Sequence, residues 1–303
     1  MPAPRRILVT GSGGFVGAHL LPALAHAYPG AAITEATADV TDRDAVMDEI
    51  ATVAPDAVIH LAAIAAITAA RQDPARAWHV NLHGTLHVAS AVLAHAPGAT
   101  LLFASTADLY GATFRSGVPI DETAMLAPLN TYAATKAAAD LALGVMAAEG
   151  LRAIRMRPFN HTGPGQTDAF VVAAFARQVA RIAAGLQPPV LQVGDLSPLR
   201  DFLDVRDVCA AYAQVLAADL TPGAILNVAS GQSRRIGDVL RDLLHAAGVT
   251  ADIQTDPARL RPSDIPIAAG DAGRLRALGW APAVPWAQTV ADTLAYWRHK
   301  IAT

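Results

Sequence analysis

The chain has 303 residues, of which 53% are hydrophobic, and a formal net charge of -3. A chain of this length can bury a large core, so we expect a soluble globular protein of one or two closely joined lobes. The negative net charge disfavours nucleic acid or an anionic membrane as the main partner. The longest apolar run, residues 57–70, contains His60 and is too short to span a bilayer. The single cysteine, Cys209, cannot form an internal disulfide, and these features together predict a cytoplasmic protein without a membrane segment.

A glycine-rich turn forms the first recognisable motif of the chain. Residues 7–10 are apolar with strand character, the turn follows, and residues 18–24 have a helical pattern. Gly11, Gly14 and Gly17 recur at three-residue spacing. Such spacing lets a backbone turn tightly, approach a pyrophosphate and pack a helix against a strand. The free N–H groups of the helix then point at the phosphates. The pattern favours a dinucleotide-binding turn over a turn without a ligand, and the cofactor contacts are expected from Gly11, Gly14, Phe15, Val16 and Gly17.

The loop after the second predicted strand, residues 31–35, is expected to select the cofactor. A dinucleotide fold commonly places an acidic residue there for the adenine ribose hydroxyls, or an arginine for a 2′-phosphate. Glu35 is the acidic candidate, with a solvated strand end as the alternative, and no basic residue occurs before Arg43. Asp39 and Val40 are better placed to contact the adenine. The sequence therefore favours NADH over NADPH.

The third predicted strand, residues 57–62, follows a helix over residues 44–53 and ends in small side chains. At this end, Leu61, Ala62 and Ala63 would let a cofactor lie against the backbone.

A further helix, predicted from Pro74 into the nineties, carries three histidines on one face. His79, His83 and His87 span about 12 Å along the helix axis, which is too far for one ion. No carboxylate or cysteine lies nearby at ligand spacing, so we expect no metal site. Asn81 on the same helix has two interpretations, an inward polar group that supports the active site or a helix kink.

Polar residues follow the fourth predicted strand, residues 101–105, and begin a helix predicted from Thr131. Thr106 and Asp108 lie beyond a strand end, where open parallel sheets bind ligands. Tyr132 and Lys136 lie one helical turn apart on one face. An ammonium beside a phenol lowers the tyrosine pKa, so the phenol can give a proton to a carbonyl oxygen that is being reduced while a threonine hydroxyl binds that oxygen. The same spacing is also common on surface helices.

The chain resembles the extended short-chain dehydrogenases/reductases that modify nucleotide sugars. The resemblance is carried by three motifs in order: the glycine turn, residues 105–111 and residues 132–136. The resemblance implies an α/β fold with a Rossmann-type doubly wound parallel sheet. Residues 1–157 and parts of 205–230 would bind NAD(P), and residues 158–303 would form mainly a smaller nucleotide-sugar lobe with a closing helix. Thr106, Tyr132 and Lys136 would be the catalytic trio, with Tyr132 and Lys136 also holding the nicotinamide ribose. The resemblance also implies a homodimer through the helices of residues 79–95 and 132–146.

Within this family, the second half of the chain resembles the reductases that convert GDP-4-keto-6-deoxy-D-mannose to GDP-D-rhamnose. The resemblance is carried by residues 157–166, 193–195, 200–207, 227–231 and 256–262. Asn160 can form a hydrogen bond to a sugar or phosphate oxygen. Arg200 and Arg259 can each bind a diphosphate through two parallel guanidinium hydrogen bonds. The alternatives are an ion pair between Arg200 and Asp201 and a solvated loop charge at Arg259 or Arg261. The substrate-binding candidates are Thr106, Asp108, Asn160, Arg200 and Arg259.

The reaction itself has alternatives, because one scaffold hosts reductases, 4-epimerases and 4,6-dehydratases. A dehydratase needs an acid and a base, which that family places directly after the catalytic threonine, whereas here Ala107 precedes Asp108. The sequence therefore favours an NAD(P)H-dependent reduction of the C4 ketone of a GDP-linked sugar. A 4-epimerase with tightly held NAD is the main alternative, and a non-catalytic NAD(P)-binding protein is another.

Overall fold

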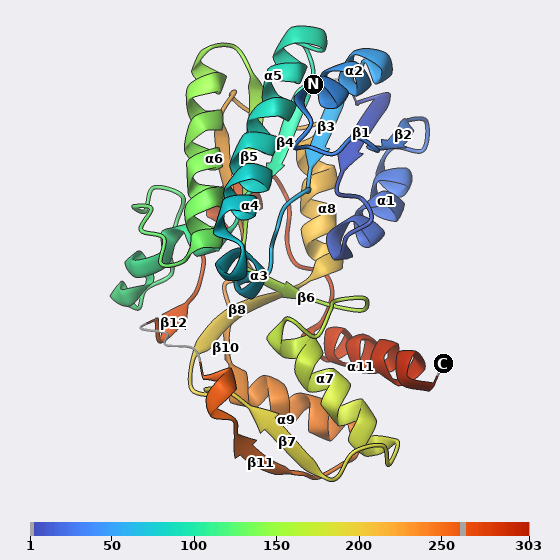
Figure 1. Ribbon diagram of the computed structural model, residues 1–303, viewed down its shortest axis with the longest axis vertical. Helices are drawn as coiled ribbons and strands as arrows, with labels where there is room; N and C mark the ends of the chain where they lie inside the picture. The colour runs from blue at the N-terminus through green and yellow to red at the C-terminus, as the bar shows by residue number, and fades with distance from the viewer. Residues whose placement is uncertain (1–2, 261–264, 303) are drawn as a thin grey trace.

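The fold is built on a six-stranded sheet in which every neighbouring pair is parallel (Figure 1). The computed structural model describes residues 3–260 and 265–302. In spatial order the strands are β2 (Ala32–Glu35), β1 (Arg6–Thr10), β3 (Ala57–His60), β4 (Thr100–Ala104), β5 (Arg152–Pro158) and β9 (Ala224–Val228). The strand order changes direction between β1 and β3, and ligands of such sheets bind outside the carboxyl ends at that switch point. The predicted doubly wound α/β fold is confirmed.

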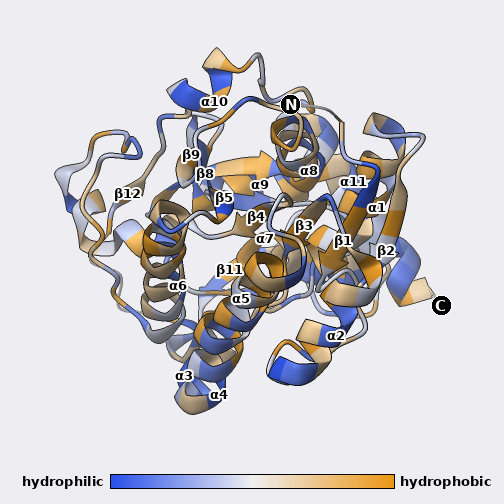
Figure 2. Ribbon diagram, turned by 90° about the horizontal axis from the view of Figure 1, so that it is seen from above, coloured by the Kyte–Doolittle hydropathy of each residue, from blue (hydrophilic) through white to orange (hydrophobic). Residues whose placement is uncertain are grey.

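Helices cover both faces of this sheet, which explains why its inner strands are continuous apolar runs. On one face α1 (Phe15–Ala27) packs against α8 (Val205–Val215). On the other face lie α2 (Arg43–Val53), α5 (Thr85–His95) and α6 (Thr131–Ala148). Figure 2 shows the apolar colour on β1, β3 and β4 between these helices. The carboxyl edge of the sheet is therefore held between two packed layers.

The helix predicted from Pro74 is interrupted in the structure. After α3 (Ile67–Gln72) come α4 (Pro74–Trp78), a π-helical segment (His79–Gly84) and then α5. The buried Asn81 lies in the π segment, where its Oδ1 accepts the N–H of Ile64 at 2.8 Å and its Nδ2 donates to Thr135 Oγ1 at 2.9 Å. Asn81 is thus an inward polar group within a π-helical segment, and its support of the active site stays a prediction.

A smaller layer of strands and helices lies beyond the first sheet (Figure 1). Its strands are β6 (Asn160–Thr162), β8 (Leu199–Asp204), β10 (Ser233–Arg235) and β12 (Ile267–Ala268), and separately β7 (Val190–Val193) with β11 (Asp252–Thr255). The helices α7 (Val171–Ala183), α9 (Ile236–Ala247) and α11 (Trp286–Ala302) pack together in one apolar cluster. Among the described residues, no helix has the length and apolar character needed to cross a membrane.

Candidate active site

The glycine turn after β1 is shaped by close backbone approaches. Gly11 has a φ of +70°, and a Cβ there would lie 2.6 Å from the backbone nitrogen of Ala62. A Cβ on Gly17 would lie 2.1 Å from the carbonyl oxygen of Ser12, so the first turn of α1 packs directly on the loop. Gly14 caps α1 and donates its N–H to the Gly11 carbonyl at 3.1 Å. Such a cradle fits the phosphates of a dinucleotide, because side chains are absent where the backbone must come close.

Phe15 and Val16 begin α1 directly after this turn. The Phe15 ring stacks on His161 with 6.2 Å between the ring centroids and 5° between the planes. His19, one turn later, bonds the Pro164 carbonyl oxygen through Nε2 at 2.8 Å. The segment after β5 therefore packs on the amino end of α1, and Phe15 joins the cofactor turn to the start of the second lobe.

The predicted adenosine contacts lie at the ends of β2 and β3. Glu35 is exposed and pairs in register with Val9, one residue before the end of β1. Asp39 is exposed, and the N–H and hydroxyl of Thr41 donate to its carboxylate and lower its pKa. Val40 is buried against Gly84. The other predicted contacts, Leu61, Ala62 and Ala63, are partly buried at the carboxyl end of β3.

The three predicted catalytic residues come from two neighbouring elements. Thr106 follows β4 and caps the next helical segment (Ala107–Ser116), where its hydroxyl oxygen accepts the N–H of Asp108 at 3.2 Å. The Thr106 hydroxyl also bonds the phenol oxygen of Tyr132, which lies in the first turn of α6. Lys136 is buried one turn further on, with its ammonium 4.0 Å from the centroid of the Phe103 ring. The structure thus joins Thr106 and Tyr132, with Lys136 on the same helix as Tyr132, against Phe103 of β4.

Burial dominates the electrostatics of this group. Burial and the nearby charge of Asp108 raise the pKa of the Tyr132 phenol, although the hydrogen bond from Thr106 lowers it. Burial also lowers the pKa of Lys136 to about 7, against an opposite effect of Asp140. The net direction for Tyr132 is therefore upward, because burial favours the neutral phenol, and burial likewise favours the neutral amine of Lys136. That Lys136 lowers the tyrosine pKa stays a prediction. A phenol in this state keeps its proton until an acceptor binds.

A buried ionic cluster behind Lys136 was missed in the sequence. The carboxylate of Asp140 accepts Arg157 Nη2 at 2.7 Å, Arg155 Nη1 at 3.2 Å and the Ser105 hydroxyl at 2.7 Å. Asp140 lies one turn beyond Lys136 on α6, and the two arginines come from β5. The helical spacing of residues 132, 136 and 140 would have identified Asp140 as a member of the same face. The cluster fixes α6 to β5 beneath the candidate site.

Asp108 and Arg200 link the first sheet to the second lobe. Burial raises the pKa of Asp108, and the charge of Arg200 lowers it. Arg200 lies on β8. Burial lowers the pKa of its guanidinium, and the negative charges of Asp108 and Asp195 raise it. The alternative of an ion pair with Asp201 does not apply, because Asp201 accepts hydrogen bonds from the backbone N–H groups of residues 230 and 231. Asn160 is exposed at the start of β6, which pairs with β8.

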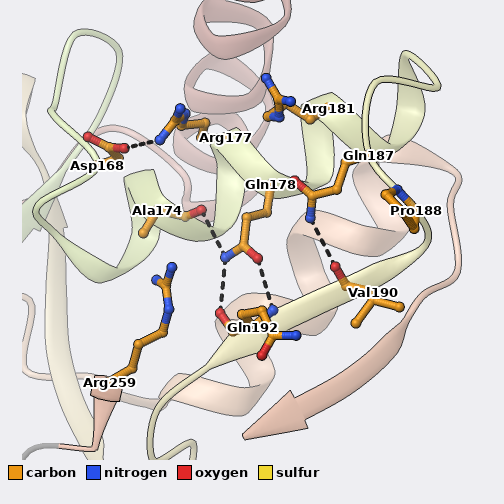
Figure 3. Close-up of a pocket in the computed structure, with 10 residues that line it drawn as sticks. All are labelled: Asp168, Ala174, Arg177, Gln178, Arg181, Gln187, Pro188, Val190, Gln192 and Arg259. Atoms are coloured by element: carbon orange, nitrogen blue, oxygen red, sulfur yellow. Dashed lines mark hydrogen bonds and ion pairs between the residues drawn. The ribbon is translucent and has the colours of Figure 1, made fainter. Parts of the chain in front are cut away.

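A cavity of about 650 Å³ lies between α7 and β7 in the second lobe (Figure 3). Arg259 reaches toward it from a short helical turn (Pro257–Arg259), and its Nε lies 3.2 Å from the carboxylate of Asp256. Gly194 packs on the Arg259 backbone, next to the Asp195 that acts on Arg200. Arg261 and Pro262, which belong to the same sequence motif, lie outside the described residues. The cavity is lined by Asp168, Ala174, Arg177, Gln178, Arg181, Gln187, Pro188, Val190, Gln192 and Arg259.

Comparisons with known proteins agree with this architecture. The family model described as the NAD dependent epimerase/dehydratase family matches residues 7–229. The chain belongs to this family. Among the family's curated members, the GDP-6-deoxy-D-mannose reductase of Pseudomonas aeruginosa is 40% identical over 301 residues, which cover 98% of each chain.

Solved structures give the same result for the family's fold. The structure of RMD from Pseudomonas aeruginosa complexed with NADPH is 39% identical, with a TM-score of 0.90, and the match covers 98% of this chain and 99% of that one. The Thermus thermophilus UDP-glucose 4-epimerase complex with NAD is 31% identical, with a TM-score of 0.85, over 97% and 99% of the two chains. The predicted family and its NAD(P) cofactor are confirmed, whereas the choice between NADH and NADPH stays a prediction.

Proposed function

We propose that this protein reduces the C4 ketone of GDP-4-keto-6-deoxy-D-mannose with NAD(P)H and forms GDP-D-rhamnose. The observation that carries the proposal is the hydrogen-bonded pair of Thr106 and Tyr132 at the carboxyl end of β4. Two hydroxyls on one side of a ligand-binding edge can both bond a carbonyl oxygen, which is the group that a ketone reductase must hold and protonate. The 40% identity to a GDP-6-deoxy-D-mannose reductase supports the same substrate.

In this proposal Tyr132 donates the proton to the substrate oxygen and Thr106 orients that oxygen. The cofactor, when bound, supplies the hydride. The raised pKa of Tyr132 keeps the phenol protonated before the reaction, as a proton donor requires. In its charged form, Lys136 stabilises the phenolate that proton transfer leaves behind and binds the nicotinamide ribose. The glycine turn, with Asp39, Val40 and the end of β3, would hold the rest of the dinucleotide.

The second lobe is proposed to bind the GDP-sugar. Arg200 and Arg259 are suited to the diphosphate, because a guanidinium can bind phosphate oxygens through two parallel hydrogen bonds. Asp108 and Asn160 would contact sugar oxygens. The cavity between α7 and β7 has a polar lining that can accept the nucleoside. Arg177 is part of this lining and forms an ion pair with Asp168. We place the boundary between the cofactor-binding lobe and the sugar-binding lobe between residues 157 and 158. Parts of residues 205–230 also belong to the cofactor-binding lobe.

The test is incubation with GDP-4-keto-6-deoxy-D-mannose and either NADH or NADPH. We expect loss of the reduced nicotinamide absorbance in step with product, and NMR of the sugar identifies rhamnose at C4. Protein that turns over a nucleotide sugar without consuming added NAD(P)H would support the 4-epimerase instead. Protein that binds the dinucleotide and turns over neither class of substrate would support a non-catalytic role.

A homodimer through α5 and α6 and a cytoplasmic location are part of the same proposal. On α6, Leu141 and Val145 are one turn apart and 58% and 62% exposed, among alanines that allow close packing. Large exposed apolar patches mark interaction sites, and these two side chains would form part of such a patch on α6. The variant Val145→Glu should halve the mass measured by light scattering, whereas Val118→Glu, at an exposed position outside α6, should leave the mass unchanged.

A further inference from the structure

The loop that follows β2 is held by a carboxylate from a different element. Oε1 of Glu49, on α2, accepts the backbone N–H of Thr37 at 2.7 Å and the Thr37 hydroxyl at 3.0 Å. Oε2 of the same side chain accepts the N–H of Ala38 at 3.4 Å. The N–H of Ala36 is donated to the Val9 carbonyl of β1 at 2.9 Å. Three consecutive backbone donors of this loop are thus already used.

The loop lies beside the cofactor turn. Glu35, its neighbour in β2, pairs in register with Val9, two residues before Gly11. In a dinucleotide fold this corner is where the adenine ribose is bound, and a 2′-phosphate there requires positive charge or free N–H groups. Here the corner instead carries the carboxylates of Glu35 and Glu49. The cationic side chains Arg76 and His79 act on Asp39, further along the loop.

From this arrangement we propose that Glu49 is a specificity-determining residue that disfavours the 2′-phosphate of NADPH relative to the 2′-hydroxyl of NADH. It acts in two ways. Its carboxylate occupies the loop N–H groups that would otherwise bind phosphate oxygens. Its charge also repels a phosphate that carries about two negative charges near neutral pH. The proposal rests on the NAD(P)-binding role of the glycine turn and does not depend on the identity of the sugar.

The test is the ratio of the dissociation constants of NADH and NADPH, measured by nicotinamide fluorescence without any sugar. In Glu49→Gln the side-chain oxygen can still accept the Thr37 N–H, so the loop keeps its main tether while the charge is removed. We expect NADPH to bind about five- to tenfold more tightly relative to NADH in this variant. The matched control is Asp48→Asn, which removes the same charge from the adjacent, exposed position of α2 and should leave the ratio unchanged.

Two results would overturn the proposal. In the first, the ratio in Glu49→Gln equals that of the unmodified protein, or Asp48→Asn shifts it equally, so that only net charge matters. In the second, Glu49→Gln weakens both cofactors by the same factor, so that Glu49 merely supports the loop. Because no sugar is present, a protein that fails to reduce the proposed substrate can still show the expected ratio, and the two failures are distinguishable.

Discussion

Asp140 and Arg157 form an ion pair in which Oδ1 and Nη2 are 2.7 Å apart and both side chains are almost fully buried. Arg155 adds a second guanidinium at 3.2 Å from the same oxygen. We expect Asp140→Asn to lower the free energy of unfolding by about 3–5 kcal/mol, because two buried cations lose their counter-ion. Denaturant unfolding followed by circular dichroism measures the change.

The matched control for this prediction is the pair of Asp238 and Arg241 on α9. Its atoms are 3.0 Å apart, but the two side chains are 47% and 76% exposed. We expect Asp238→Asn to cost less than about 1 kcal/mol, since solvent screens an exposed pair. Equal losses in the two variants would show that the cluster behind Lys136 has no special importance for the fold.

Lys136 is predicted to lower the stability of the protein in a pH-dependent way. Burial reduces its pKa from 10.5 to about 7, so between these values the unfolded chain binds more protons than the folded one and stability rises with pH. Below pH 7 both states are protonated and the full cost of burying the charge is present. We therefore expect Lys136→Met to be about 1–4 kcal/mol more stable than the unmodified protein below pH 7.

This advantage of Lys136→Met should shrink as the pH rises from 7 toward 10, which thermal unfolding across the pH range can follow. Lys300→Met removes a lysine at an exposed position of α11 and is the control for the loss of a lysine that is not buried. An advantage of the Lys136 variant that stays constant with pH would contradict the assignment of the effect to its ionisation.

Tyr132→Phe removes the proposed proton donor and keeps the ring. Because general acid catalysis contributes about 10²- to 10⁴-fold, we expect a loss of kcat in that range, with a much smaller weakening of dinucleotide binding from the lost contact to the nicotinamide ribose. Tyr28→Phe serves as the control, since the Tyr28 hydroxyl donates to the Ala213 carbonyl between α1 and α8 and should affect stability only. Reduction at an undiminished rate in the Tyr132 variant would remove that residue from the mechanism.

Gly11→Ala should abolish dinucleotide binding. The added Cβ would approach Ala62 to 2.6 Å at a φ of +70°, so either the turn or the end of β3 must move. Isothermal titration with the dinucleotide would show the loss directly. In Gly30→Ala the Cβ meets nothing within 4 Å, and we expect binding to be unchanged. If Gly11→Ala binds the cofactor normally, the close approach of the turn to β3 has no part in binding.

The parts of the molecule that could be predicted from the sequence are those governed by local backbone chemistry. The glycine turn is one, because few residues tolerate the approach of Gly11 to Ala62. The helix predicted over residues 44–53 is another, since it nearly coincides with α2. The parallel sheet is implied by the resemblance to the short-chain dehydrogenases/reductases, which rests on these local motifs. The roles of the individual site residues stay predictions until variants are measured.

Features that depend on distant partners could not be predicted in the same way. The tether from Glu49 to Thr37 joins a helix to a loop twelve residues earlier, and neither sequence nor spacing indicates it. The direction of the Tyr132 pKa depends on how deeply the first turn of α6 is buried, which pairwise reasoning about Lys136 does not include. Arg157 belonged to a recognised motif, but its partner Asp140 lies on another element.

The π-helical segment His79–Gly84 accommodates one residue more than an α-helix needs over the same turn. Deleting one residue here would restore ordinary winding and leave α4 and α5 in nearly the same orientation. His87, beyond the segment, would then still face the Val40 carbonyl that it bonds at 2.9 Å. The local cost would fall on Asn81, whose bonds to Ile64 and Thr135 depend on its position within the extra-wide turn.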